Sequence, residues 1–240
     1  MEQAFCETVA LPGGEARVQW RRSARARRVS LRIDPRDGAV VVTLPPRIGR
    51  PAGVALLMDN ADWVAQRLAA LPGATPFADG ALVPLGGVAH RIRHMPQRRG
   101  SAWLEEGEIR VAGDAAFLAR RVSDFLRAEA RRGLAELVAE KASLAGLRPS
   151  RVSVKDTRSR WGSCAASRAL AFSWRLVMAP RFVQDYVVAH EVAHLRHMNH
   201  GPLFWALVGT LTPHMQAAML WLRDEGPRLM RVGLMRVGTG

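Results

Sequence analysis

The sequence has few cysteines, few lysines and no long apolar runs. The scarcity of cysteine and of apolar runs argues against disulfide-stabilised and membrane-spanning proteins. Cys6 and Cys164 are the only cysteines in 240 residues, too few and too far apart for a disulfide framework. No apolar run approaches the roughly 20 residues of a membrane-spanning helix, and the first residues lack the basic and apolar regions of a secretory signal. We therefore expect a cytoplasmic protein with reduced thiols and no membrane partner.

Lysine occurs only twice, so the net charge of +14 comes from arginine. Guanidinium groups match phosphate and carboxylate geometry, so nucleic acid is one possible partner. The alternative is a composition rich in arginine throughout, since both halves of the chain are basic. The densest cluster lies between Arg21 and Arg28, and a second lies at Arg158 and Arg160. The sequence leaves nucleic-acid contact through this basic surface open.

The hydrophobic pattern predicts an α+β protein with two parts. Residues 1–112 read as a β-rich region with one helix: RRVSLRID and AVVVTLPP flank the turn residues Asp37-Gly38, and PAGVALLMDNADWVAQRL has helical spacing. Residues 113–240 read as a helical domain with a short sheet. We expect a long helix between Asp114 and Gly146, a strand at RVSVKDT, a strand of about ten residues at ALAFSWRLVM, and a helix from Pro180.

The segment HEVAHLRHMNH, residues 190–200, holds four of the seven histidines of the chain. His190 and His194 are four residues apart, so on a helix they share one face and can bind one ion. Glu191 projects to the side, where it can reach a water on that ion without being a ligand. This is the H-E-x-x-H arrangement of zinc hydrolases, whose catalytic zinc needs a third protein ligand and an open position. A solvated helix face with incidental histidines is the weaker interpretation, because apolar residues surround the motif.

Two histidines compete for the third position. His200 follows a segment that ends one helix and precedes Gly201-Pro202, which can start another, so the chain can turn back and present it. His197 lies closer, but it occupies the place where metzincins have the glycine that breaks the helix. We favour His200, with His197 as a helix cap or a solvent-facing side chain. Tyr186 lies one turn before His190, either near an oxyanion or in the core.

Three blocks resemble a known family: RWGSC at 160–164, AFSWRLVMAP at 171–180 and HEVAHLRHMNHGPLFWALV at 190–208. They are similar to the YgjP-like metallopeptidases, zincin-type proteins related to the SprT group, and RRSARARRVSLRI and DWVAQRL extend the resemblance towards the N-terminus. The resemblance implies a zincin-like metallopeptidase domain at 113–240. It also implies zinc bound by His190, His194 and His200, with Glu191 as the catalytic carboxylate.

The resemblance further implies that a strand edge near the active-site helix holds an extended peptide. Arg160, Trp161 and Ser163, in the expected turn before the second strand, are candidate substrate-binding residues, although the tryptophan fits a core position equally well. Arg175 and Tyr186 are candidate donors to an oxyanion.

The leading function is hydrolysis of a peptide or protein substrate by a water that Glu191 activates. The rivals are hydrolysis of a phosphorylated substrate such as a nucleotide, a protease that acts on nucleic-acid-bound protein, and a purely structural metal.

Overall fold

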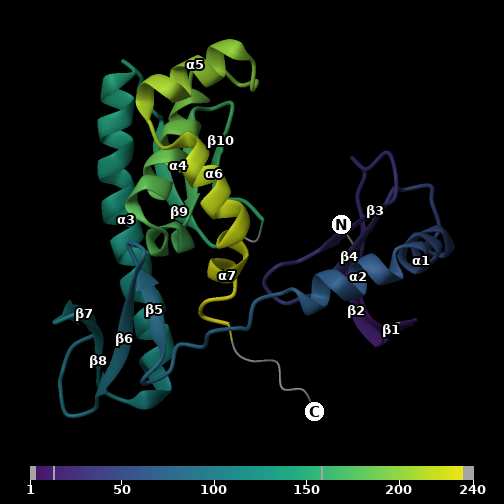
Figure 1. The fold of residues 1–240 in the computed structure, drawn as a ribbon, viewed down its shortest axis with the longest axis horizontal. Helices are drawn as coiled ribbons and strands as arrows, with labels where there is room; N and C mark the ends of the chain where they lie inside the picture. Colours follow the sequence, from purple (N-terminus) through teal and green to yellow (C-terminus); the bar gives the residue numbers. More distant parts are fainter. Residues whose placement is uncertain (1–3, 13, 158, 235–240) are drawn as a thin grey trace. The chain divides into compact units, whose positions relative to one another are not determined.

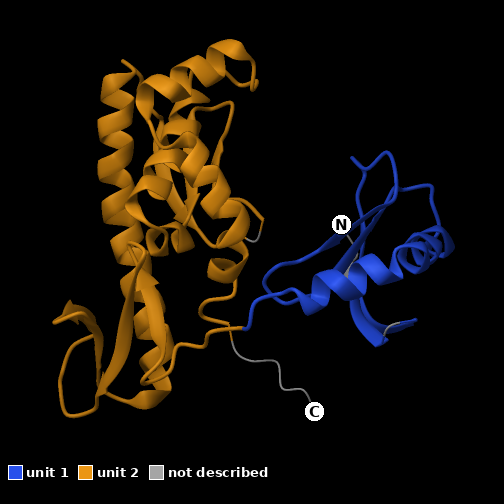
Figure 2. Ribbon diagram, viewed as in Figure 1, with its two compact units in different colours: residues 1–73 blue, residues 74–240 orange. Residues whose placement is uncertain are grey.

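The computed structural model describes residues 4–12, 14–157 and 159–234, and within them the chain forms two compact units (Figures 1 and 2). The first unit comprises residues 1–73 and the second comprises residues 74–240. Sequence analysis places the boundary at residue 112. The structure divides the chain earlier because the sheet formed by residues 82–112 packs against the long helix that follows it and shares its core.

The first unit is a four-stranded sheet with two helices. Its strands are β1 (Ala4–Leu11), β2 (Gly14–Arg22), β3 (Ser30–Ile33) and β4 (Val40–Leu44), in the order β1-β2-β4-β3. The expected hairpin at Asp37-Gly38 is confirmed, since β3 and β4 pair antiparallel. The one helix expected at 51–68 is instead two, α1 (Arg50–Asp59) and α2 (Ala61–Ala69), interrupted at Asn60. Both helices place apolar residues, among them Leu57 and Val64, in the core of this unit.

The second unit begins with a sheet of the same strand order. Its strands are β5 (Leu82–Leu85), β6 (Val88–Met95), β7 (Ala102–Glu105) and β8 (Glu108–Ala112), in the order β5-β6-β8-β7. As in the first unit, two hairpins meet through one parallel pair of strands. Ile92 and Val111 are fully buried and belong to the core that the rest of the unit also builds.

A long helix connects this sheet to the remaining elements. A short 3₁₀ turn (Ala115–Phe117), capped by Asp114, precedes α3 (Leu118–Leu144), and Gly146 follows it with a φ of 64°. This matches the expected helix from Asp114 to Gly146, with a glycine in the left-handed conformation where L-residues are strained. In Figure 1, α3 is drawn in teal and runs along one side of the unit, beside β9 and α4.

The small sheet that follows has three strands among the described residues: β9 (Arg151–Lys155), β10 (Gly162–Cys164) and β11 (Ala169–Ser173). Their order is β10-β11-β9, so β10 is an edge strand. Two expectations are corrected here. Residues 162–164 form a strand where a turn was expected. The ten-residue strand at 169–178 ends at Ser173, because residues 174–178 wind into a 3₁₀ helix. A short apolar run does not distinguish a buried strand from a buried helical turn.

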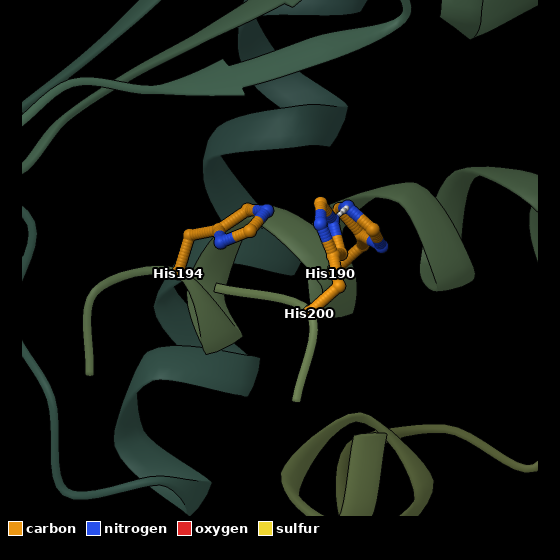
Figure 3. Close-up of side chains that lie close together, drawn as sticks. All are labelled: His190, His194 and His200. Carbon is orange, nitrogen blue, oxygen red and sulfur yellow. Dashed lines mark hydrogen bonds between the residues drawn. The ribbon is translucent and has the colours of Figure 1, made fainter. Parts of the chain in front are cut away.

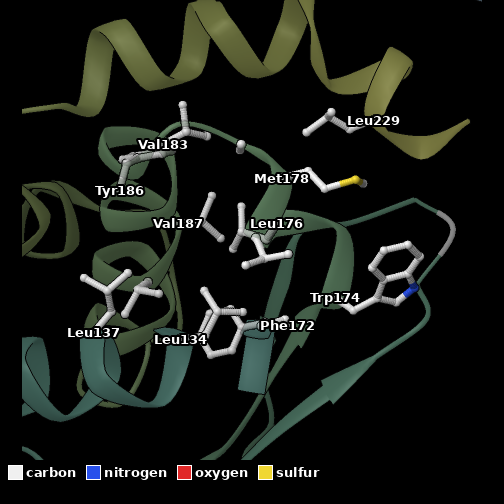
Figure 4. Packing of buried hydrophobic residues seen from close by; sticks show 14 of the residues in the cluster. Leu134, Leu137, Phe172, Trp174, Leu176, Met178, Val183, Tyr186, Val187 and Leu229 are labelled. Carbon is white, nitrogen blue, oxygen red and sulfur yellow. The ribbon is translucent and has the colours of Figure 1, made fainter. Parts of the chain in front are cut away.

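Four helices complete the described part of the unit: α4 (Arg181–Ala193), α5 (Pro202–Leu211), α6 (Met215–Asp224) and α7 (Gly226–Met230). Figure 4 shows the core between them, where Leu134 of α3, Phe172 of β11 and Val187 of α4 meet. The α+β class is thus confirmed. Among the described residues, no helix combines the length and apolarity that crossing a bilayer requires.

Candidate metal centre

The last turn of α4 places two histidines side by side. The backbone N–H of His194 donates to the carbonyl of His190 at 3.3 Å, the one-turn contact expected of residues four apart. Their rings meet edge to face, with centroids 4.9 Å apart. Apolar neighbours such as Val188 and Val192 are fully buried, so packing of α4 fixes the direction in which both imidazoles point.

The chain then turns back and adds a third imidazole. α4 ends at Ala193, and α5 begins with Pro202 in its first turn. Between them His200 approaches the helix: its Nε2 lies 3.2 Å from Nε2 of His190, and its ring centroid lies 4.7 Å from that of His194. One nitrogen from each of the three histidines lies within 4.8 Å of the others. Figure 3 shows the three rings converging.

His197 contributes its backbone to this group. Its carbonyl oxygen lies 3.0 Å from Nδ1 of His194 and accepts the proton of that ring nitrogen. This bond fixes the tautomer and leaves Nε2 of His194 with a free lone pair, as outer-sphere partners of metal-binding histidines do. The sequence motif gives no sign of this role, which depends on the path of the backbone after α4.

Two aromatic side chains of α5 line the histidine cluster. Phe204 is fully buried, and its ring centroid lies 4.5 Å from that of His194 and 4.7 Å from that of His200. The ring centroid of Trp205 lies 5.6 Å from that of His200. These rings restrict the orientation of the imidazoles and exclude water from one side of the cluster. Their position in the first turn of α5, shortly after His200, places them beside it.

The arrangement fits a bound cation. Burial, and then the proximity of His194 and His200, lowers the pKa of His190 to about 4, so this imidazole is neutral at pH 7, as a metal ligand must be. Within the described residues its Nδ1 is buried without a hydrogen-bond partner, which costs free energy. Its Nε2 faces another imidazole nitrogen at hydrogen-bond distance, so a proton or a cation must lie between them. Three imidazole donors suit zinc among other transition metals.

Glu191 lies beside the cluster and is 6% exposed. Burial raises the pKa of its carboxyl to about 7, although the charge of Arg160 acts in the opposite direction. A carboxyl with a pKa near the working pH is suited to accept and return a proton.

Gly162 of β10 packs directly against this carboxylate. A Cβ atom at position 162 would lie 2.5 Å from Cγ and 2.6 Å from Oε1 of Glu191, closer than van der Waals contact permits. The absence of a side chain at this position therefore permits the backbone of β10 to approach Glu191 closely. The residue that approaches the backbone of β10 is the candidate general base.

We expect Gly162→Ala to lower hydrolysis by about 10²-fold while the metal content is retained. The added methyl displaces Glu191, and a shift of about 1 Å in a reacting group costs about this much, whereas the three histidines are untouched. Gly209→Ala in α5 is the matched control, because no atom lies within 4 Å of the position of its Cβ. Steady-state kinetics and metal analysis of both variants test this, and full activity of Gly162→Ala would contradict it.

The raised pKa of Glu191 also predicts a pH-dependent stability difference in the metal-free chain. The folded state keeps the proton up to about pH 7, whereas an unfolded glutamate loses it near 4.5. The stability that this difference contributes is therefore present below pH 4.5 and lost as the pH rises to 7. Glu191→Gln should be more stable than the wild type at pH 8, by about 3 kcal/mol at most, and the difference should vanish near pH 4.

Denaturant unfolding in the presence of a chelator measures this difference. The shift at His190 has the opposite sign but is present in both proteins, so it cancels in the comparison. Equal stability of variant and wild type at every pH would show that the carboxyl is not desolvated.

The remaining candidate residues occupy different environments. Arg160 is exposed, and Ser163 lines a groove beside β10. Trp161 is half-buried and packs on α7, where a Cβ at Gly226 would lie 3.3 Å from its ring. Tyr186 is 7% exposed, with its ring 5.9 Å from that of His190. Burial and then the charge of Glu191 raise the pKa of its phenol, which keeps it a proton donor.

Arg175 is not placed as an oxyanion donor would be. It is 2% exposed, its guanidinium binds Asp156 and the carbonyl of Val232, and it stacks on Trp174. The 3₁₀ turn after β11 directs this side chain into the core. This geometry favours a structural role, in which Arg175 ties the C-terminal segment to the small sheet.

The basic cluster of the first unit is exposed. Arg25, Arg27 and Arg28 lie at the surface between β2 and β3, and Arg22 donates to the carbonyl of Pro46. Arg158, which forms the second basic cluster of the sequence together with Arg160, lies outside the described residues. Nucleic-acid contact through this surface stays a prediction.

A family model described as the YgjP-like metallopeptidase domain matches residues 27–225. The chain belongs to the YgjP-like family. The match begins in the first unit, after β2, and ends in the second, so this YgjP-like region covers part of each unit together with the histidine cluster and β10. The resemblance inferred from RWGSC and the histidine motif is thereby confirmed, and the chain carries a metallopeptidase domain.

Among solved structures, this YgjP-like chain is similar to the metallopeptidase zymogen of Pyrococcus abyssi abylysin. The TM-score is 0.35 and the identity is 16%, over 39% of this chain and 92% of that one. A comparison with curated proteins gives no match.

Proposed function

We propose that the chain is a zinc-dependent peptidase whose metal ligands are His190, His194 and His200 and whose general base is Glu191. The observation that carries the proposal is the convergence of three imidazoles beside the buried carboxyl group of Glu191, next to an edge strand. Three protein ligands leave a coordination position open, which a catalytic zinc requires and a structural zinc lacks. The purely structural interpretation also leaves the buried carboxylate of Glu191 without a purpose.

The edge strand β10 offers a place for an extended peptide. The N–H of Ser173 donates to the carbonyl of Trp161, so residues 161 and 173 form a hydrogen-bonded pair. Because such pairs alternate along antiparallel strands, Gly162 and Cys164 direct their N–H and C=O groups away from β11. An extended substrate that pairs with these groups lies beside Glu191, which contacts Gly162.

Each residue then has a defined task. Zinc, when bound, supplies Lewis acidity and lowers the pKa of a coordinated water. Glu191 accepts the proton of the attacking water at its carboxylate and returns it to the nitrogen of the leaving amine. The carbonyl of His197 holds the tautomer of His194, while Phe204 keeps the imidazoles oriented. We propose Tyr186, with its protonated phenol, as the candidate donor to the oxyanion, and Arg160, Trp161 and Ser163 as residues that contact the substrate.

Metal analysis of the purified chain, together with an unbiased peptide-library digest, tests the proposed function. We expect one zinc per chain and cleavage that stops when the metal is removed. Nucleoside triphosphates in parallel reactions separate peptide hydrolysis from the rival attack on a phosphoanhydride. Release of phosphate without peptide cleavage would overturn the peptidase assignment and retain the metal site.

A further inference from the structure

A groove of about 390 Å³ lies on the outer face of the small sheet. The register places Ser163 of β10 opposite Ala171 of β11, and Ala171 opposite Ser153 of β9. These small side chains form the floor of the groove, since the neighbouring residues Leu170 and Phe172 point to the other face and are fully buried. The floor therefore leaves room for side chains that come from outside the sheet.

The charged residues that line the groove are all basic. Arg151 and Lys155 come from the two ends of β9, and Arg160 precedes β10, whereas no aspartate or glutamate among the described residues lines the groove. None of the three cations forms an ion pair with the residues that the structure describes. The neighbouring Asp156 binds Arg127 and Arg175 instead. A concave surface that is lined by positively charged side chains, with no carboxylate among its described lining residues, attracts anionic groups.

The groove and the candidate catalytic carboxylate share the edge strand β10, since Ser163 lines the groove and Gly162 contacts Glu191. Arg160 lines the groove and lowers the pKa of Glu191 through its charge. Cys164 lines it too, and burial, followed by the charge of Glu191, raises the pKa of its thiol. The strand that supplies Ser163 and Cys164 to the groove also supplies Gly162, which packs on Glu191. A peptide that pairs with β10 thus has this basic groove next to its reacting segment.

We propose that the groove is a subsite for acidic side chains, so that the enzyme selects peptides with aspartate or glutamate near the bond that is cleaved. This assignment rests on the proposed peptidase function and names the substrate class of the same site. Arg151, Lys155 and Arg160 bind the carboxylates of the substrate at the sheet surface, where exposed ion pairs each contribute modestly. Together the three pairs give a preference of about tenfold over an uncharged peptide.

Binding to the full-length Glu191→Gln variant tests the subsite without turnover. The probes are a fluorescein-labelled glutamate-rich peptide and the same peptide with glutamine at those positions, and fluorescence anisotropy measures both affinities. We expect the acidic peptide to bind about tenfold more tightly at low salt. The preference should vanish near 1 M salt, where the screening length falls to about 3 Å.

Charge reversal locates the effect. Arg151→Glu with Lys155→Glu should remove or invert the preference for the acidic peptide. The matched control is Arg98→Glu with Arg99→Glu, which makes the same change in net charge on an exposed turn between β6 and β7. An equal loss in both double variants would assign the preference to the overall charge of the protein and overturn the subsite. So would an unchanged preference in the β9 variant, or a nucleoside triphosphate that displaces the acidic peptide at much lower concentration.

Turnover by the wild type separates this proposal from the proposed function. Cleavage of both peptides with equal kcat/KM would retain the peptidase and overturn the acidic subsite. Tight binding of the acidic peptide that depends on Arg151 and Lys155, with no cleavage of any peptide, would retain the subsite and overturn the peptidase.

Discussion

Glu191→Gln is expected to lower peptide hydrolysis by about 10²–10⁴-fold, the usual contribution of a general base, while the zinc content stays at one ion per chain. Glutamine keeps the shape of the side chain and a hydrogen-bonding group but cannot accept the proton of the attacking water. Glu191 belongs to neither the histidine cluster nor its hydrogen-bond partners, so the metal should stay.

Paired measurements of kcat/KM and metal content on the same preparation test this expectation. Glu136→Gln in α3 is a suitable control, because that carboxylate is exposed and pairs only with Arg132 in the described part of the chain. Loss of zinc from Glu191→Gln would indicate that the carboxylate is a ligand. Unchanged hydrolysis would remove Glu191 from the mechanism.

His200→Ala is expected to empty the metal site and abolish hydrolysis, whereas His197→Ala should leave both nearly unchanged. His200 places its Nε2 within hydrogen-bond distance of that of His190, so its loss leaves two ligands. The decrease in zinc affinity should exceed the roughly 10–100-fold that loss of an outer-sphere partner costs. His197 acts through its backbone carbonyl on His194, and alanine keeps that carbonyl.

Zinc titration against a competing chelator measures both affinities, and circular dichroism confirms that the variants fold. A His197→Ala chain that loses zinc while His200→Ala retains it would reverse the ligand assignment. Equal weakening in both would mean that the imidazole of His197 contributes as well as its carbonyl.

Local sequence patterns determined several helices, a hairpin and the histidine pair of the candidate metal centre. The spacing of His190 and His194 needs only a helix to make them neighbours, and α4 supplies it. The residues Gly201-Pro202 after the histidine motif predict that the first helix has ended and that a second helix begins. The structure has this break, since α4 ends at Ala193 and α5 begins at Pro202. The helix between Asp114 and Gly146 and the hairpin at Asp37-Gly38 follow from capping and turn chemistry. All these features depend on contacts between residues close together in the chain.

Only the tertiary structure decided the features that depend on distant residues. The apolar run at 169–178 does not reveal that it bends after Ser173, because burial rather than periodicity sets its conformation. The boundary after Gly73 depends on β5–β8 sharing a core with α3. The sequence offered Arg175 as a candidate donor to the oxyanion. In the structure this side chain is buried and binds Asp156, which lies 19 residues away in the chain.

The same distinction holds within the site. The sequence supplied His190, Glu191 and His194, whose relative positions a single helix fixes. It also indicated His200, because Gly201-Pro202 predicts that the chain breaks and starts a new helix there. It did not supply the contact of Gly162 with Glu191 or the row of Ser163, Ala171 and Ser153 beneath the basic groove. These contacts exist because β10 pairs with β11 and packs on α4, and strand pairing and register depend on the whole fold more than on local sequence.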